Sequence, residues 1–530
     1  MTGARAKADR FYSFLAGLAL LGWSSALLSA APGAGFRITP YLQNPSETAI
    51  TVTWLSEDDR PGLLRLMSGQ GIEIRQLRSL PVLARALEYQ AGEMIEPDSG
   101  LARNLPYLHQ QRIEGLEPGG AYRFLVEQGG ESAGGQFHTP DKSKSSLRFI
   151  VFGDSETEPE SAGKFTPWPG AGDAEPERKY LVDQETGYRA NLELIRGRAP
   201  DFVAIAGDLV ESGGEQRDWD EFWRLTAPLA SETFLIPALG NHEYFAGPGA
   251  LGQYGPEASR QAVDRYLTYF DLPANNSGRQ AHRERYYTVN WNAVTLVVLD
   301  LNNGTPQRSS SDTNWFLLGD GEGGQAPDWK PGSEQYRWLE QALEQAQQNS
   351  AFTFVMFHHC PYSSGVHGLP PGERDGEDRL SGRPLRVLTP LFMRYGVDVV
   401  LTGHDEMYEH SLVPGQEILP GGKSREHALH VYDVGVGGDG LRGPISGLEN
   451  PYRVFLAHQD APEIRDDQGV LVDGGKHYGH LEVNVTASDS GAWEARLDMV
   501  YLFPVAGEDG QYRFERRLYN DGTLLVSQPE

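Results

Sequence analysis

The chain of 530 residues contains one cysteine, Cys360, and far fewer basic than acidic side chains. A single cysteine excludes a disulfide within the chain, so the hydrophobic core has to supply the stability. Lysine and arginine total 46 against 73 aspartates and glutamates, which gives a formal net charge of −27. Binding of nucleic acid requires a basic surface, so this balance argues against nucleic acid as a partner. Acidic clefts, by contrast, concentrate cations.

Long apolar runs are almost absent as well. The exception lies at the N-terminus, where three basic residues among the first ten precede the apolar run 14–28. This run is shorter than the roughly 20 apolar residues that a membrane span needs, and Leu28-Ser29-Ala30 resembles a cleavage site. We therefore interpret residues 1–30 as a cleaved signal peptide and expect a secreted or periplasmic protein without an integral membrane span. An uncleaved N-terminal anchor is the alternative.

A chain of this length predicts two or more domains. Residues 36–140 are mostly strand-like, and the stretch 48–54 alternates in polarity at a period of two. Further on, the turn cluster 115–120 precedes Tyr122 at the start of another alternating strand, as in the tyrosine corner of a β-sandwich. We predict a small all-β sandwich over residues 36–140 and interpret it as a scaffold, with a binding module as the alternative.

From residue 147 onward, short apolar runs alternate with helical patterns. Five runs fit strands buried on both faces of a sheet, at residues 149–152, 202–206, 234–239, 352–357 and 397–401. Helical periodicity is present at residues 185–197, 219–229, 258–269 and 334–348. Strands interleaved with helices predict stacked α/β layers, and we place this second domain at residues 147–505.

Each of the five strands is followed at once by turn residues and by side chains that bind metals. The five segments are Gly153-Asp154-Ser155-Glu156, Gly207-Asp208, Gly240-Asn241-His242-Glu243, His358-His359 and Gly403-His404-Asp405-Glu406. In α/β sheets, ligands gather at the carboxyl ends of the strands. The sequence therefore predicts one crevice lined by carboxylate, amide and imidazole groups, with glycines that let the backbone approach an ion closely.

The order of these segments resembles the calcineurin-like metallophosphoesterase superfamily, and within it the purple acid phosphatase-like proteins that carry an N-terminal fibronectin-III-like domain. The resemblance covers residues 147 to about 501. It implies the α/β fold class, with a layered α/β/β/α metallophosphoesterase sandwich preceded by a small all-β, fibronectin-III-like sandwich. It also implies a binuclear metal centre with ions about 3.5–4 Å apart, whose metal-bound hydroxide attacks phosphorus.

The resemblance assigns metal ligands residue by residue. Asp208 corresponds to the bridging carboxylate between the two ions, and Asp154 corresponds to a ligand of the first ion. Asn241, His358 and His404 correspond to further ligands. For the imidazole we favour His358, the first residue beyond the apolar run, over the histidine that follows it.

Two positions depart from the superfamily pattern, and both concern the first metal site. Glu156 stands where the general pattern has histidine, and Glu406 stands where the closing GHxH motif has its second histidine. If both glutamates coordinate, the first site is oxygen-rich and favours Mn, Ca or Fe over Zn, which remains a candidate for the centre as a whole. Alternatively, the substitutions leave the first site weak or empty. The tyrosine that colours purple acid phosphatases is also missing, because residue 211 is glutamate.

Three further residues are expected to act on the substrate. His242 corresponds to the family histidine that stabilises the transition state or protonates the leaving alcohol, and Glu243 is expected to orient it. His367 lies nine residues after His358, at an offset similar to that of a phosphate-contacting histidine in purple acid phosphatases.

The resemblance therefore implies an exported, acid phosphatase-like phosphomonoesterase that acts on a small-molecule phosphoester. A phosphodiesterase is the alternative among enzymes. The alternative from another class is a degenerate relative that binds metal or phosphate, or serves adhesion, without turnover. The sequence specifies neither the substrate nor the oligomeric state.

Overall fold

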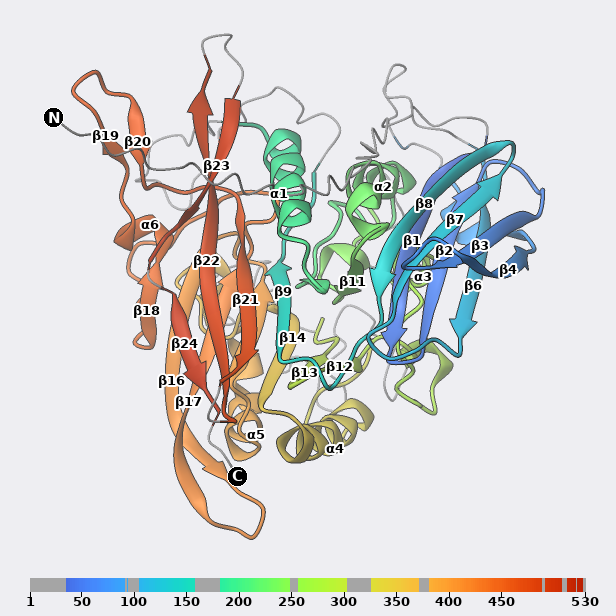
Figure 1. Ribbon diagram of the computed structural model, residues 1–530. Coiled ribbons are helices and arrows are strands. Elements are labelled where there is room, and N and C mark those ends of the chain that lie inside the picture. The colour runs from blue at the N-terminus through green and yellow to red at the C-terminus, as the bar shows by residue number, and fades with distance from the viewer. Residues whose placement is uncertain are drawn as a thin grey trace, which may run out of the picture.

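The computed structural model describes residues 35–90, 93, 104–157, 182–247, 256–302, 326–370, 381–488, 491–507, 512–520 and 522–527. A small β domain formed by the N-terminal part of the chain lies beside a larger α/β domain (Figure 1). The expected signal peptide over residues 1–30 lies outside the described residues. No helix within the described ranges is long and apolar enough to cross a membrane.

The N-terminal domain contains two four-stranded antiparallel sheets. The first has the order β1-β2-β6-β5, with β1 at Phe36–Ser46, β2 at Ala49–Ser56, β5 at Val82–Leu83 and β6 at Tyr107–Glu114. The second has the order β4-β3-β7-β8, with β3 at Gly62–Ser68, β4 at Glu73–Ser79, β7 at Ala121–Gln128 and β8 at Glu131–His138. The expected small all-β region is confirmed.

A tyrosine corner fixes one end of this domain. The hydroxyl of Tyr122, at the start of β7, accepts a hydrogen bond from the backbone N–H of Glu117 at 2.9 Å. The bond ties the preceding turn to the strand, as in β-sandwich domains. The more specific fibronectin-III-like classification stays a prediction.

The larger domain contains two seven-stranded sheets. The first has the order β11-β10-β9-β21-β22-β23, and β24 also pairs with β22. Its strands are β9 (Ser146–Phe152), β10 (Phe202–Ile205), β11 (Phe234–Pro237), β21 (Gly479–Ala487), β22 (Trp493–Ala506), β23 (Tyr512–Leu518) and β24 (Thr523–Val526). The second has the order β12-β13-β14-β15-β17-β16-β18 and consists of β12 (Tyr287–Trp291), β13 (Val294–Val298), β14 (Phe352–His359), β15 (Val399–Gly403), β16 (Tyr408–Ile418), β17 (Ser424–Val434) and β18 (Arg453–Leu456). A small separate sheet pairs β19 (Ile464–Arg465) with β20 (Leu471–Asp473).

The α-helices of the described ranges are α1 at Gln184–Arg198, α2 at Gln216–Ala230, α3 at Pro256–Tyr269, α4 at Glu334–Asn349, α5 at Thr389–Arg394 and α6 at Ala457–Asp460. Two of them begin at side-chain caps: Asp183 accepts from the N–H of Thr186 at 2.8 Å, and Ser333 accepts from the N–H of Tyr336 at 3.2 Å. Such caps satisfy donors that the first helical turn leaves open. The first four helices lie where the periodicity predicted them.

The two large sheets pack face to face, and helices cover their outer sides. Phe149 of β9 contacts Phe354 of β14 edge to face, with ring centroids 5.2 Å apart. Helix α1 contacts β22 of the first sheet, whereas α4 contacts β13 and β14 of the second (Figure 1). This α/β/β/α layering confirms the expected fold class.

Parallel strands bring the candidate ligands to one edge of the domain. Strands β9, β10 and β11 are parallel and in register, with Phe202 opposite both Phe149 and Phe234. In the second sheet β13, β14, β15 and β17 also run parallel. The carboxyl ends of the two sheets meet where the N–H of Gly153 donates to the carbonyl of Val434 at 3.0 Å. Side chains that follow these strands therefore converge from both sheets.

The first sheet continues past residue 505, where we expected the domain to end. Strand β22 reaches Ala506, and β23 and β24 both pair with β22. Side chains of these two strands are exposed or half-buried, so no strong apolar pattern marks them in the sequence. The expected boundary therefore excludes two strands of this sheet.

The N-terminal domain packs against helices of the larger domain. Arg37 of β1 pairs with Asp220 of α2 at 3.0 Å, and Gln43 donates to the backbone carbonyl of Tyr269 in α3 at 2.7 Å. The rings of Phe137 and Phe234 lie 6.3 Å apart across the contact, and one hydrophobic core runs through both domains. This contact favours the interpretation of the β domain as a scaffold.

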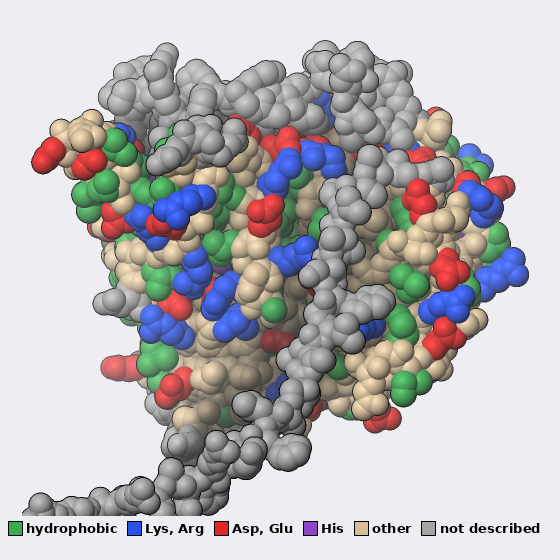
Figure 2. All heavy atoms as spheres, turned by 45° about the horizontal axis from the view of Figure 1, so that its top comes forward, with side chains coloured by type: hydrophobic (Ala, Val, Ile, Leu, Met, Phe, Trp, Pro, Cys, Tyr) green, Lys and Arg blue, Asp and Glu red, His purple; other side chains and the backbone are tan. Residues whose placement is uncertain are grey.

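The face seen in Figure 2 carries side chains of both charges. On that face Lys and Arg side chains are interspersed with Asp and Glu. Exposed ion pairs of this kind contribute little stability. The acidic groups that bear on function are buried instead, at the carboxyl ends of the strands.

Candidate metal centre

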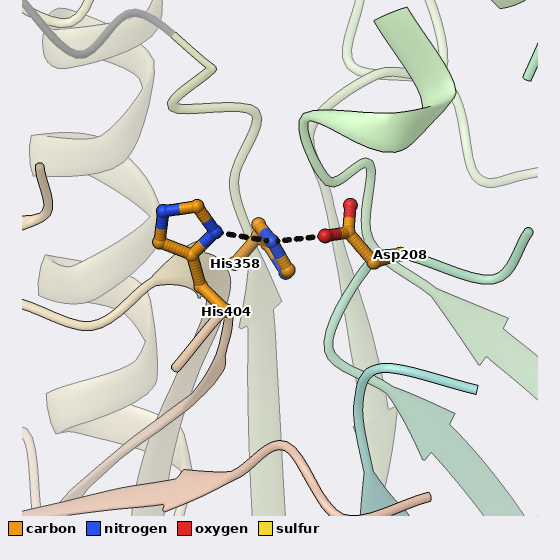
Figure 3. A group of neighbouring side chains, drawn as sticks. All are labelled: Asp208, His358 and His404. Carbon is orange, nitrogen blue, oxygen red and sulfur yellow. Dashed lines mark hydrogen bonds and ion pairs between the residues drawn. The ribbon is translucent and has the colours of Figure 1, made fainter. Parts of the chain in front are cut away.

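Three possible metal-ligand atoms surround Nε2 of His358. Its Nε2 lies 2.8 Å from Oδ2 of Asp208, 3.0 Å from Oδ1 of Asn241 and 3.1 Å from Nδ1 of His404. Figure 3 shows Asp208 and His404 on opposite sides of the His358 ring, each joined to it by a dashed line. All four residues are buried. They follow or end strands β10, β11, β14 and β15, so the parallel arrangement of both sheets brings them together.

The hydrogen bonds of His358 fix how its two ring nitrogens are used. Nδ1 lies 2.9 Å from the carbonyl oxygen of Ala206, which only accepts, so Nδ1 carries a proton. Burial opposes a second proton on the ring, but the Asp208 carboxylate outweighs this and raises the pKa of His358 to about 9. The negative potential that favours this second proton also favours a metal ion in its place, bound by the lone pair of Nε2.

Four residues of the site have positive φ although none is glycine. The φ angles are 55° for Asp154, 49° for Asp208, 82° for His404 and 47° for Glu406. Each follows the end of a strand, where the backbone turns sharply into the crevice. Left-handed conformations of such residues carry strain and cluster at functional sites. These backbone outliers therefore support a functional site independently of its chemistry.

Carboxylates crowd the position beside the His358 group. Oxygens of Asp154, Glu156 and Asp208 all lie within 4.8 Å of one another. Burial raises the pKa of Asp154 to about 7 and raises that of Glu156 well above its usual value, and neighbouring carboxylates add to both effects. Close carboxylates of this kind ionise together only when a cation offsets their charges. The three side chains therefore fit the expected oxygen-rich metal position.

Glu406 joins a different group from the one expected. Its carboxylate lies within 4.8 Å of oxygens of Glu156 and Asp439, and its Oε1 pairs with Nη2 of Arg442 at 2.5 Å. Glu156 therefore belongs to both carboxylate groups, and Glu406 belongs to the second. Sequence analysis missed Asp439 and Arg442. The available signal was the glycine-rich run 435–440, which follows β17 at the same edge as the other ligands.

His242 lies on the more open side of the centre. Its side chain is 24% exposed, and its Nε2 is 3.9 Å from Oδ2 of Asp208. Its Nδ1 lies 2.6 Å from the backbone carbonyl oxygen of Glu211, so this nitrogen donates. Burial opposes protonation of the ring, but the carboxylates of Asp208 and Glu211 outweigh it and raise the pKa of His242 to about 10. In the metal-free protein the protonated form of this ring is therefore favoured at neutral pH.

Glu243 lies between the loops that carry Asp208 and His242. Its carboxylate accepts hydrogen bonds from the backbone N–H groups of Asp208, Leu209 and Gly240 at 2.7–3.0 Å. These bonds hold the loops after β10 and β11 together. The charge of Glu243 also helps to raise the pKa of His242, and the carbonyl of Glu211 contacts Nδ1 of that ring. The expected role of Glu243 in orienting His242 stays a prediction.

Two further histidines, His367 and His359, pack against the imidazole of His404. The ring centroid of His367 lies 3.8 Å from that of His404, and its Nε2 accepts from Nη1 of Arg442 at 2.8 Å. Burial and the adjacent Arg442 lower the pKa of His367 well below its usual value, so the ring is neutral. His359 is also buried, and its ring centroid is 4.3 Å from that of His404. The expected phosphate contact of His367 stays a prediction.

The domain has a metallophosphoesterase fold: two stacked sheets carry carboxylate, amide and imidazole side chains at the carboxyl ends of their strands. Residues 147–407 match the family model described as Calcineurin-like phosphoesterase. The chain therefore contains a calcineurin-like phosphoesterase domain, as the order of its motifs predicted. The matched range includes every metal ligand expected from the sequence, whereas Asp439 and Arg442 lie beyond it.

Several curated relatives share part of the chain. An uncharacterised protein of Mycobacterium tuberculosis is 26% identical over 310 residues, which are 57% of this chain and 50% of the relative. Probable purple acid phosphatase 20 of Arabidopsis thaliana is 25% identical over 237 residues, which are 44% of this chain and 46% of the relative. Probable inactive purple acid phosphatase 27 of the same plant is 23% identical over 285 residues, 52% and 38% of the two chains. This chain spans half or less of their lengths, so their names alone do not assign its activity.

Two solved structures share the fold. A purple acid phosphatase, PPD1, isolated from yellow lupin (Lupinus luteus) seeds aligns with a TM-score of 0.56 and 19% identity, covering 91% of this chain and 74% of that one. PhoD aligns with a TM-score of 0.56 and 15% identity, covering 94% of this chain and 93% of that one. At such low identities, the likeness establishes the fold alone.

Proposed function

We propose that this protein is an exported, metal-dependent phosphoester hydrolase, an acid phosphatase-like phosphomonoesterase with a binuclear metal centre. The observation that carries the proposal is the convergence of Asp208, Asn241 and His404 on Nε2 of His358, at 2.8–3.1 Å. A second group of carboxylates that shares Asp208 adjoins it. The calcineurin-like domain and the purple acid phosphatase-like relatives agree with this function.

The donor set fits two metal ions. One position offers oxygen and nitrogen donors, from Asp208, Asn241, His358 and His404. The other offers only oxygens, from Asp154, Glu156 and Asp208, and this favours a hard ion such as Mn²⁺, Ca²⁺ or Fe³⁺ over Zn²⁺. Asp208 is common to both positions, and a carboxylate between two cations offsets their repulsion.

Residues around the metal positions supply a proton and hold the loops in place. Bound ions supply Lewis acidity toward the phosphate oxygens and lower the pKa of water. His242 lies on the open side with its Nδ1 held by the carbonyl of Glu211. Its Nε2 is thus the nitrogen that gives a proton to the leaving alcohol as the P–O bond breaks. Glu243 keeps the loops that carry Asp208 and Asn241 at a fixed separation.

A degenerate protein that binds metal or phosphate without turnover is the second candidate. One observation favours it: Glu406 pairs with Arg442 and lies outside the group formed by Asp154 and Asp208. Four plant relatives also carry the word inactive in their names. The complete donor group around His358 and the open position of His242 support the enzyme.

The test combines metal content of the purified protein with hydrolysis of an aryl phosphate and a bis-aryl phosphate. We expect at least two ions per chain and faster turnover of the monoester. Asp208→Asn should lose metal and on the order of 10³-fold in kcat, about 4 kcal/mol. Asp398→Asn is the matched control, because it changes a carboxylate that precedes β15 at the end remote from His404.

Three outcomes separate the candidates. Faster turnover of the diester would make the protein a phosphodiesterase. Turnover that is equal in Asp208→Asn and in the wild type would exclude this metal centre as the active site. One ion or none, with no turnover after reconstitution with Mn²⁺, Ca²⁺, Fe or Zn²⁺, would favour the binding protein.

A further inference from the structure

Two separate contacts fix His367 beside the metal centre. Its backbone N–H donates to Oδ1 of Asp405 at 3.0 Å, and its ring packs on that of His404, with centroids 3.8 Å apart. The 3-10 turn that carries it, Val366–Gly368, follows Gly365, where a Cβ would lie 2.5 Å from Oδ1 of Asp405. Glycine thus lets the loop approach Asp405 closely. The backbone therefore places the His367 ring against a proposed metal ligand.

The hydrogen bond from Arg442 determines which ring nitrogen of His367 carries the proton. Nη1 of Arg442 lies 2.8 Å from Nε2 of His367. A guanidinium has N–H donors and no acceptor, so Nε2 accepts with its lone pair and holds no proton. In a neutral imidazole one nitrogen accepts and the other donates. The contact with Arg442 therefore makes Nδ1 the donor of this ring.

Nδ1 of His367 is a buried donor that the described residues leave unsatisfied. His367 is 6% exposed, and within the part of the chain that the structure describes its Nδ1 has no hydrogen-bond partner. Buried polar groups are normally hydrogen-bonded, and an unpaired one is costly to keep. The oxygens of an ionised phosphate accept such bonds. An N–H donor next to the metal centre therefore fits a phosphate bound there.

The guanidinium of Arg442 is itself held in place. Its Nη2 pairs with Oε1 of Glu406 at 2.5 Å. Nζ of Lys476 donates to the backbone carbonyl of Leu441, the preceding residue, at 2.8 Å. An arginine presents its donors in a rigid, planar fork, so the contact with Glu406 also sets the direction of Nη1. The loop after β17 thus controls a ring in the loop after β14.

We propose that Arg442 is a positioning residue that holds His367 in the Nδ1–H tautomer, so that this N–H donates to an oxygen of the substrate phosphate. This role rests on the proposed function, since the phosphate is that of the phosphoester bound at the same centre. It divides two tasks between two histidines. His242 gives a proton to the leaving alcohol, whereas His367 binds the phosphate and keeps its proton.

NMR of the histidine nitrogens reads the tautomer directly. The full-length chain is reconstituted with Zn²⁺, whose filled d shell avoids paramagnetic broadening, and His367→Ala identifies the signals of His367 by their loss. In the wild type, Nδ1 should be protonated and Nε2 unprotonated. In Arg442→Met the hydrogen bond to Nε2 is absent, and we expect a mixture of the two tautomers. A wild type that carries this proton on Nε2 would overturn the proposal, whether or not the variant folds.

Calorimetric titration with inorganic phosphate measures the consequence, in proteins of equal metal content. His367→Ala should bind phosphate about tenfold more weakly than the wild type, which corresponds to one hydrogen bond. Arg442→Met should also bind it more weakly, and the double variant no more weakly than His367→Ala alone, because Arg442 acts through His367. Arg442→Lys keeps a donor for Nε2 and should recover part of the affinity. Arg425→Met, the control, removes an arginine at the opposite end of β17 and should bind phosphate like the wild type.

Additive losses in the double variant would mean that Arg442 binds phosphate itself, and would overturn the positioning role. Equal phosphate affinity in the wild type and in Arg442→Met would do the same, as would a wild type that binds no phosphate. Neither measurement requires turnover, so these outcomes are distinguishable from failure of the proposed function. A wild type that hydrolyses neither ester would refute the hydrolase, while the Nδ1–H tautomer and a non-additive loss of phosphate affinity would still support the role of Arg442.

Discussion

Two buried glutamates of the first large sheet, Glu482 and Glu156, differ in the partners that surround their carboxylates. Glu482, within β21, is 1% exposed, and its carboxylate contacts Arg198, Arg516 and Asn484 at 2.7–3.1 Å. Glu156, in the loop after β9, is 2% exposed, yet one of its oxygens has no hydrogen-bond partner among the described residues. The two glutamates are thus equally buried. Basic side chains balance the charge of Glu482, whereas no described basic side chain bonds to this oxygen of Glu156.

The pKa values of the two side chains move in opposite directions. Burial alone raises the pKa of Glu482, but hydrogen bonds from Arg198 and Asn484 and the charge of Arg516 outweigh it and lower the pKa to about 2. Burial raises the pKa of Glu156 well above its usual value, and nearby carboxylates add to the effect. The protein supplies its own cations where a buried carboxylate stabilises the sheet. At the metal centre it leaves the charge for a metal ion.

The largest effect should come from removing the charge of Asp208, the carboxylate that belongs to both proposed metal positions. Asp208→Asn keeps the shape of the side chain and removes its charge. We expect kcat to fall on the order of 10³-fold, about 4 kcal/mol. The free energy of unfolding of the metal-free protein should also fall, because His358 and His242 outweigh the effect of burial and lower the pKa of Asp208 to about 2, and its charge therefore stabilises the fold at neutral pH. Steady-state kinetics and urea unfolding after chelation measure the two quantities. A loss of stability with kcat unchanged would show that Asp208 is structural.

Glu482→Gln should have the next largest effect, and it should lower the free energy of unfolding rather than kcat. It removes the charge that Arg198 and Arg516 compensate, so the free energy of unfolding at pH 7 should fall by about 2–3 kcal/mol. The pKa of Glu482 is about 2 in the folded protein, below that of an unperturbed glutamate. The contribution is therefore fully present at pH 7 and is lost as the pH falls from about 4.5 toward about 2.

Urea unfolding of Glu482→Gln between pH 7 and pH 3 measures this contribution. The stability difference from the wild type should shrink steadily as the pH is lowered. The control is Glu494→Gln, a half-buried glutamate on the neighbouring strand β22, which should change stability little at any pH. A difference that stays constant with pH would mean that packing, not charge, explains the loss.

The effect of Glu156→Gln on the free energy of unfolding should be opposite in the metal-free and the metal-loaded protein. In the metal-free protein at pH 7.5 it removes an uncompensated buried charge, so we expect stabilisation by about 1–2 kcal/mol. In the metal-loaded protein the same change removes a ligand. Metal binding at 100 times its Kd stabilises by about 2.7 kcal/mol, and the variant should lose part of this gain. Thermal unfolding with and without chelator tests it; the same sign in both states would contradict it.

Local pattern predicted the fold and the strand ends that carry the candidate ligands, because both depend on short stretches of sequence. Apolar runs that end in Gly-Asp, Gly-Asn-His or Gly-His fix the strands and the edge at which they end, and this located Asp154, Asp208 and His404. Strands β23 and β24 were missed because they are half-exposed and pair only through long-range contacts with β22.

Helices and strands follow from local sequence, whereas the contacts between side chains depend on how distant loops fold back onto one another. Asp439 reaches Glu406 because residues 437–439 donate to carbonyls almost three hundred residues earlier in the chain. No local pattern specifies this return, so Asp439 and Arg442 were not foreseen. The hydrogen bonds of Glu243 to the backbone after β10 were not foreseen for the same reason.

The smallest expected effect concerns Asn484, the neutral member of the group around Glu482. Asn484 donates to Oε1 of Glu482 at 3.0 Å and accepts from Nε of Arg148 at 2.7 Å. Asn484→Ala should reduce the free energy of unfolding by about 1 kcal/mol and raise the pH at which acid unfolding begins. It should leave kcat and metal content unchanged, because the side chain stabilises only the sheet. A change in kcat would show that Glu482 and the metal centre are coupled through β21 and β9, and that the two ways of treating a buried carboxylate are not independent.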